Sequence, residues 1–172
     1  DTGLFLDHRN TRKKVGETAA GKRFLNLFSY TGSFTVYAAT GGAASSETVD
    51  LSNTYLDWAK RNFELNGISP EQHKIVRADV FQYLQNAAAE GKQFDLIVMD
   101  PPSFSNSKKM LDILDIQRDH KKLIDGAMNL LASDGLLYFS NNLRSFVLDD
   151  SVSEQYAVKD ISKQSVPDDF RN

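Results

Sequence analysis

The fold is decided by residues 24–33, which read Phe24-Leu25-Asn26-Leu27-Phe28-Ser29-Tyr30-Thr31-Gly32-Ser33. The apolar run predicts a buried strand, the small residues predict a tight turn, and a helical pattern begins at Phe34. A helix start leaves backbone N–H groups unpaired and carries the positive end of the helix dipole, so this geometry binds charged or polar ligands. We expect Gly32 to let the backbone approach such a ligand. An ordinary strand–turn–helix of an α/β protein is the competing interpretation of this stretch alone.

The composition limits the classes of protein that remain. The chain has 172 residues, 41% of them hydrophobic, which is enough for one domain with a full core. Its net charge of -3 argues against a non-specific polyanion binder, and the absence of cysteine excludes disulfides and thiol nucleophiles. Three scattered histidines argue against a metal centre, and the lack of a long apolar run or signal-like N-terminus predicts a cytoplasmic protein. Because the chain opens on Asp1, we expect an excised domain or a processed product.

Hydrophobic periodicity predicts five strands that alternate with helices. The first strand begins at Phe24, and the others cover residues 45–50, 73–77, 94–99 and 136–140. This alternation requires a mostly parallel sheet with right-handed crossovers and helices on both faces. In the tail we expect a short helix at 149–155 and a strand at 156–163. The predicted fold class is therefore α/β.

Acidic residues follow three of these strands, at the edge where parallel sheets bind ligands. Asp50 lies 18 residues beyond Gly32, a spacing that suits hydrogen bonds to both hydroxyls of a ribose. Asp79 either caps the next helix or reaches an adenine amino group, and one residue can do both. Asp100-Pro101-Pro102 is a rigid loop that holds a carboxylate after the most apolar strand, as an active site requires. A polar loop, 105–115, is expected to be mobile over the site.

The glycine turn lacks both G-x-G-x-x-G and G-x-x-x-x-G-K, which disfavours dinucleotide and triphosphate ligands. A nucleoside cofactor without phosphates fits better, because carboxylates would repel a pyrophosphate. A basic run precedes the first strand, and it is either a solvated helix face, a wall of the ligand site or a contact for phosphates. It comprises Arg9, Arg12, Lys13, Lys14, Lys22 and Arg23.

Four motifs carry a resemblance to a known family. They are Thr2-Gly3-Leu4-Phe5-Leu6-Asp7-His8-Arg9, Asn26 to Ser33, Val49-Asp50-Leu51-Ser52 and Asp100-Pro101-Pro102-Ser103-Phe104-Ser105-Asn106-Ser107-Lys108. The chain resembles the class I S-adenosylmethionine-dependent methyltransferases, and in particular the C-terminal half of the bifunctional 23S ribosomal RNA guanine methyltransferases. The likeness runs from Thr2 to about Asn142 and continues faintly through Asp168-Asp169-Phe170.

The resemblance implies a Rossmann-like fold, S-adenosylmethionine as cofactor and 23S ribosomal RNA as substrate. The family half methylates guanine N7, and fused N-terminal methyltransferase and RNA-binding domains, absent from this chain, modify N2 of another guanine. It also implies one domain over 1–172: an extension lining the site (1–23), a core (24–142) and a C-terminal part (143–172) that lacks the last edge strand. No metal and no membrane contact are implied.

The resemblance assigns residues to roles at their positions in this sequence. The implied catalytic residues are Asp100, Pro101 and Pro102. The implied cofactor-binding residues are Phe5, Asp7, Arg9, Phe28, Ser29, Tyr30, Thr31, Gly32, Ser33, Asp50, Leu51, Ser52, Asp79, Val80 and Asp100. The implied substrate-binding residues are Ser103, Phe104, Lys108 and Lys109.

Two departures from related patterns bear on the substrate. A related group methylates cytosine C5 through a cysteine thiolate, and this chain has no cysteine, which excludes that chemistry. Many amino-group methyltransferases place an aromatic residue directly after the two prolines, where Ser103 stands here and Phe104 follows. Alternatives that stay open are another methyl acceptor, such as guanine N2, a small molecule or a protein, and a non-catalytic RNA-binding module with this fold.

Overall fold

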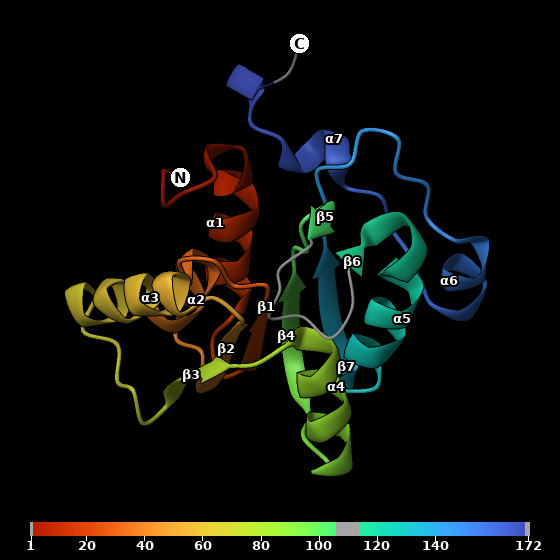
Figure 1. The fold of residues 1–172 in the computed structure, drawn as a ribbon. Coiled ribbons are helices and arrows are strands. Elements are labelled where there is room, and N and C mark those ends of the chain that lie inside the picture. Colours follow the sequence, from red (N-terminus) through yellow and green to blue (C-terminus); the bar gives the residue numbers. More distant parts are fainter. Residues whose placement is uncertain (1, 106–113, 171–172) are drawn as a thin grey trace.

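The computed structural model describes residues 2–105 and 114–170 (Figure 1). Its centre is a five-stranded sheet with the order β3-β2-β1-β4-β7, and every neighbouring pair is parallel. The strands are β1 (Arg23–Leu27), β2 (Ser45–Asp50), β3 (His73–Arg77), β4 (Phe94–Met99) and β7 (Leu131–Phe139). The predicted α/β class with a parallel sheet is confirmed.

Helices cover both faces of the sheet (Figure 1). One side carries α1 (Arg9–Thr18), α2 (Ser33–Thr40) and α3 (Asn53–Leu65), and the other carries α4 (Val80–Ala89) and α5 (Ile116–Met128). A short 3-10 helix, η1 (Leu6–His8), leads into α1.

Side chains along the central strands point alternately to the two faces of the sheet, and each face has its own hydrophobic core. Leu96 and Val98 pack with α1 and α2, whereas Ile97 and Met99 pack with α4 and α5. Side chains of successive strand residues point to opposite faces, so a strand buried on both faces must be apolar throughout. This is why the run at 94–99 predicted a central strand correctly.

The fifth strand starts earlier than its pattern predicted. We expected the preceding helix to continue to Leu131 and the strand to begin at Leu136, but α5 ends at Met128 and β7 begins at Leu131. The register of β7 against β4 shifts between Phe94, which pairs with Leu131, and Leu96, which pairs with Leu136. A bulge in β7 therefore accommodates the residues of the predicted turn within the strand.

The C-terminal part after β7 contains a short helix, α6 (Asp150–Gln155), as predicted. The predicted strand at 156–163 is wrong. That segment belongs to none of the strands of the described chain, and it leads into a helical turn, α7 (Ser162–Ser165). Just before this turn, the Asp160 carboxylate accepts a hydrogen bond from the N–H of Ser162 at 2.8 Å. The chain then forms η2 (Asp168–Phe170), which lies beside the start of α1 above the strand ends (Figure 1).

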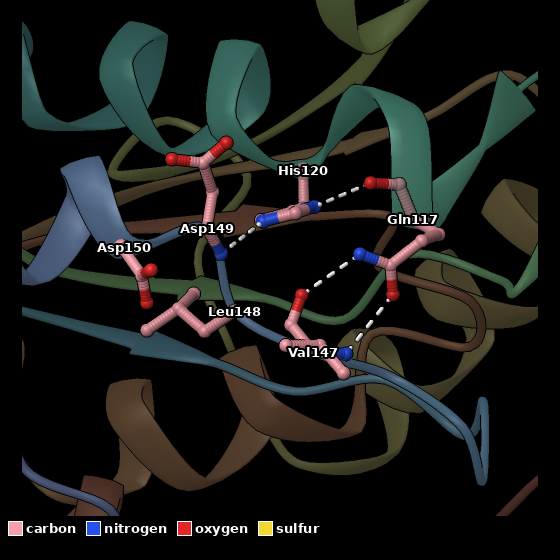
Figure 2. Close-up of a pocket in the computed structure, with 6 residues that line it drawn as sticks. All are labelled: Gln117, His120, Val147, Leu148, Asp149 and Asp150. Atoms are coloured by element: carbon pink, nitrogen blue, oxygen red, sulfur yellow. Dashed lines mark hydrogen bonds between the residues drawn. The ribbon is translucent and has the colours of Figure 1, made fainter.

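A latch on α5 fixes the segment that precedes α6 (Figure 2). His120 Nε2 faces the N–H of Asp149 at 2.9 Å and must accept, while Nδ1 faces the carbonyl of Gln117 at 2.9 Å and must donate. The side chain of Gln117 makes two further bonds to the backbone of Val147, both at 2.8–2.9 Å. The side chains of His120 and Gln117 thus satisfy backbone groups of the segment that borders this small depression of about 360 Å³.

Within the described part of the chain, each helix is too short or too polar to cross a bilayer. The same residues contain no group of three or more side chains arranged to hold a metal ion.

Candidate cofactor and substrate site

The turn after β1 adopts an unusual backbone path. Phe28, Tyr30 and Gly32 all have positive φ angles, of 55°, 51° and 73°. Two of these are bulky residues for which that region is strained, so surrounding contacts must hold them there. Tyr30 packs its ring 4.7 Å from that of Tyr55 and 5.2 Å from that of Phe5.

Gly32 lies close to a neighbouring helix. A Cβ at this position would lie 2.9 Å from the Cβ of Ala59 and 3.2 Å from the ring of Phe63, both on α3. The absence of a side chain therefore allows a close approach to helix α3. Gly32 also sets the left-handed start of α2.

The N-terminal segment is clamped onto this turn. Gly3 donates its N–H to the Tyr30 hydroxyl at 3.0 Å, and its carbonyl accepts from the Thr31 hydroxyl at 2.7 Å. A side chain at Gly3 would lie 2.3 Å from the Trp58 ring, so the segment fits here only with glycine. These contacts place η1 and α1 over the end of β1.

Asp50 ends β2 with both carboxylate oxygens oriented. Oδ2 accepts the N–H of Tyr30 at 3.0 Å, and Oδ1 accepts the N–H of Ser52 at 2.9 Å. Burial raises the pKa of Asp50, and these backbone N–H groups offset part of that rise. Each oxygen keeps a second lone pair, so the carboxylate can still accept from two neighbouring hydroxyl groups of a ligand.

Asp79 takes the capping role that was one of its two predicted alternatives. Its Oδ1 accepts from Gln82 N–H at 3.1 Å at the start of α4. The residue also lines the depression described below, so a second contact through Oδ2 remains available.

Asp100 follows β4, where two side chains from distant parts of the chain orient its carboxylate. The Ser140 hydroxyl donates to Oδ1 at 2.6 Å, and His8 Nε2 lies 3.5 Å from Oδ2. The next residue, Pro101, is buried. The loop therefore presents a carboxylate that is 26% exposed and is oriented by two side chains.

A large depression, of about 1510 Å³, lies at this edge of the sheet and extends along β7 to the C-terminal segment. That volume exceeds the range usual for one small ligand, about 300–1,000 Å³. The predicted site residues that line it are Phe5, Asp7, Phe28, Ser29, Tyr30, Ser33, Asp50, Leu51, Ser52, Asp79, Val80, Asp100, Pro101 and Pro102.

Other predicted residues do not line the depression. Arg9 instead forms a two-pronged pair with Asp169 in η2, which raises the pKa of Arg9. Thr31 and Gly32 are held in the turn, and Ser103 donates its hydroxyl to Asn142. Phe104 in β5 (Phe104–Ser105), which pairs with β6 (Leu114–Asp115), is 59% exposed. Lys108 and Lys109, like most of the predicted mobile loop, lie outside the described residues.

Residues that the sequence did not single out complete the site. His8 and Ser140 contact Asp100, and Asn26 from β1 bonds the Thr35 hydroxyl at 3.1 Å. The signal for His8 was its place in the Asp7-His8-Arg9 motif, and the signal for Ser140 was its position at the end of the predicted fifth strand. Of the interpretations of the basic run, the wall of a site fits Arg12, which is only 2% exposed and lines the depression.

Comparison with known proteins identifies the family. The family described as S-adenosylmethionine-dependent methyltransferase matches residues 1–171. The chain belongs to this family. Its cofactor is therefore S-adenosylmethionine, as the predicted nucleoside without phosphates indicated.

The relatives carry names from ribosomal RNA modification. The chain is 92% identical over 172 residues to ribosomal RNA large subunit methyltransferase K of Neisseria meningitidis, covering all of this chain and 49% of that protein. It is 59% identical over 170 residues to ribosomal RNA large subunit methyltransferase K/L of Chromohalobacter salexigens, covering 99% of this chain and 23% of that protein. The chain thus spans about half of the first relative and under a quarter of the second.

A solved structure supports the fold and the cofactor. A protein classed as a methyltransferase and crystallised with S-adenosylhomocysteine superposes with a TM-score of 0.78 at 38% identity. The match covers 83% of this chain and 37% of that one. The Agrobacterium tumefaciens S-adenosylmethionine-dependent methyltransferase shares the fold, with a TM-score of 0.76 at 24% identity and coverage of 83% and 47%.

The residues present suit this cofactor. A nucleoside with two neighbouring ribose hydroxyls can donate to the oriented oxygens of Asp50, and the buried Ser29 hydroxyl has no partner among the described residues. Both residues line the depression, whose volume leaves room for a second molecule.

Proposed function

We propose that this domain methylates N7 of a guanine in 23S ribosomal RNA, as the C-terminal half of a longer cytoplasmic enzyme. The relatives named above, which act in ribosomal RNA modification by their names, support the substrate class. The observation that carries the choice of acceptor atom is the engagement of Asp100, whose two oxygens face Ser140 and His8. A carboxylate held by two side chains is suited to positioning a ligand, and guanine N7 carries no proton that it would have to accept.

Guanine N7 needs no base. When bound, the cofactor supplies an electrophilic methyl group, and the N7 lone pair forms the new bond to that carbon as the carbon–sulfur bond breaks. No proton leaves the guanine, and the ring carries the positive charge that the sulfur gives up. The contribution of the protein is therefore alignment in a site shielded from water, together with the negative charge of Asp100 nearby.

The guanine must reach the depression outside a helix. N7 faces the deep major groove of A-form RNA, which side chains cannot enter, so the base has to be unpaired or flipped out. Phe104 follows the Asp100-Pro101-Pro102 loop and is 59% exposed, and we assign it to stacking on such a base. Lys108 and Lys109 are assigned to the flanking phosphates on sequence grounds.

The experiment is methyl transfer from radiolabelled S-adenosylmethionine to protein-free 23S ribosomal RNA, with this chain and with the longer protein that contains it. Phe104→Ala should weaken RNA binding by about 1–3 kcal/mol, while Leu65→Ala, an 84% exposed apolar residue on α3, serves as the control. Asp100→Asn should lower turnover while leaving the loop folded.

The product decides the acceptor atom. N7-methylguanosine is cleaved at the glycosidic bond after borohydride and aniline treatment, so the labelled RNA should break at the modified nucleotide. RNA that resists this treatment and yields N2-methylguanosine on digestion would refute N7. Transfer to a metabolite or protein extract in preference to ribosomal RNA would refute the substrate class.

A further inference from the structure

Two side-chain hydrogen bonds join the loops that follow β4 and β7. The Ser140 hydroxyl donates to Asp100 Oδ1 at 2.6 Å. Further along both loops, the Ser103 hydroxyl donates to the side-chain oxygen of Asn142. Asn141 lies between these two bonds in the chain, and it lines the same depression as Asp100. Its side chain therefore belongs to a fixed part of the wall, next in sequence to the residue that orients the carboxylate.

The amide of Asn141 has a defined orientation. Its oxygen accepts from the N–H of Leu143 at 3.0 Å, and because an N–H can only donate, the amide nitrogen takes the other position. Leu143 packs against the hydrophobic core, which holds this turn in place. Among the described residues, no acceptor bonds the amide nitrogen of Asn141, whose side chain is half-buried. The residue therefore keeps two N–H donors for a ligand in the depression.

We propose that Asn141 selects guanine as the methyl acceptor by donating a hydrogen bond to O6 of the base, an inference that rests on the proposed function. O6 and N7 are neighbouring acceptors on one edge of guanine, so a base that turns N7 toward the methyl group brings O6 to the adjoining wall. Adenine carries an amino group at the position of O6. Two donors would then face each other, and the amide of Asn141 would lose its partner.

The other polar groups of these loops are less suited to this role. The carboxylate of Asp100 offers only acceptors when it is ionised, so it cannot bind O6. Ser140 and Ser103 use their hydroxyl hydrogens within the protein. The amide of Asn142 also has donors, but its side chain is exposed, and a donor that water can satisfy discriminates less between bases.

The test changes one base of the RNA. The longer protein that contains this chain is given an RNA fragment that spans the nucleotide at which aniline cleaves, with guanine, inosine or 2,6-diaminopurine at that nucleotide. Inosine keeps N7 and O6 and lacks the 2-amino group, whereas 2,6-diaminopurine keeps N7 and the 2-amino group and has an amino group in place of O6. The unaltered protein should methylate guanine and inosine, and kcat/KM for 2,6-diaminopurine should be lower by about 10-fold or more.

Two variants separate the donor from the turn and from charge. Asn141→Asp keeps an oxygen for the N–H of Leu143 and replaces the donors by a second acceptor, which suits the 6-amino group of 2,6-diaminopurine. It should shift the ratio of kcat/KM values toward 2,6-diaminopurine by about 10-fold or more, and this shift is independent of the intrinsic reactivity of N7 in the two bases. Asn142→Asp adds the same charge one residue away and should keep the preference for guanine. Both variants should bind S-adenosylhomocysteine as the unaltered protein does.

The other outcomes overturn the inference. Equal losses for both bases in Asn141→Asp would mean that the added charge or the fold is responsible, and a shift confined to Asn142→Asp would transfer the role to Asn142. Weaker binding of S-adenosylhomocysteine to Asn141→Asp would place the residue at the cofactor.

The comparison of bases by the unaltered protein does not depend on the folding of any variant. If it forms the N7 product equally well on 2,6-diaminopurine and on guanine, the proposed function stands and the role of Asn141 is refuted. If it forms N2-methylguanosine, or transfers no methyl group to RNA, the proposed function fails and this inference fails with it.

Discussion

Replacing Asp50 with alanine should separate cofactor binding from folding. In the structure its carboxylate is the acceptor for two backbone N–H groups, those of Tyr30 and Ser52, at 3.0 and 2.9 Å. The remaining lone pairs face the depression, where we assign them to the two ribose hydroxyls. Asp50→Ala removes those acceptors and leaves the strand and turn in place.

The expected magnitude follows from these contacts. Hydrogen bonds to a charged group contribute about 1.5–3 kcal/mol, which corresponds to a loss of affinity of about 10- to 150-fold. Stability should change less, because the two N–H groups lose their acceptor while the cost of burying the charge disappears. That cost is the burial that raises the pKa of Asp50.

The assay is calorimetric titration with S-adenosylhomocysteine, with thermal unfolding measured in parallel. Asp57→Ala, which removes one exposed carboxylate from α3, is the matched control and should bind as the unaltered chain does. Asp50→Asn should also bind weakly, because its amide would set a donor against the N–H of Tyr30 or of Ser52. An unchanged dissociation constant for Asp50→Ala would refute the ribose contact.

The raised pKa of Asp50 gives the same prediction a pH dependence. A carboxyl whose pKa is higher in the folded state stabilises the fold most at acidic pH, and this contribution is lost as the pH rises through the folded pKa. Cofactor binding uses the ionised carboxylate and has the opposite trend. Affinity for S-adenosylhomocysteine should therefore fall on acidification at a higher pH than an ordinary aspartate would give, and Asp50→Asn should lack this fall.

Three further predictions concern the ligand, the RNA and the fold. S-adenosylmethionine and S-adenosylhomocysteine should bind while NAD and ATP do not, because the turn has no phosphate cradle; tighter binding of NAD in calorimetry would contradict this. The isolated chain, with a charge of -3, should bind ribosomal RNA weakly and with a steep dependence on salt, and tight binding at high salt in a filter assay would contradict it. His120→Phe keeps a ring against Phe146 but leaves the Asp149 N–H without its acceptor, so urea unfolding should show a loss of about 1–3 kcal/mol; an unchanged midpoint would show that the latch is dispensable.

The order and type of the main elements were predictable because they depend on local patterns. The run at 94–99 was predictable as a central strand, since four consecutive apolar residues at 96–99 suit a strand covered on both faces. The acids at 50, 79 and 100 were predictable as a group, because parallel strands all end at one edge of the sheet. The family likeness was carried by the same short motifs.

Contacts between distant segments decided the rest. The bulge in β7 depends on pairing with β4, the tail at 156–163 lacked a partner strand, and Gly32 is required by helix α3. Arg12 was indistinguishable from its solvated neighbours in a basic run, since burial is a property of what packs over a residue. Periodicity and spacing along the chain report how each segment folds locally, whereas only the tertiary structure determines which charges are shielded from water and which side chains converge on Asp100.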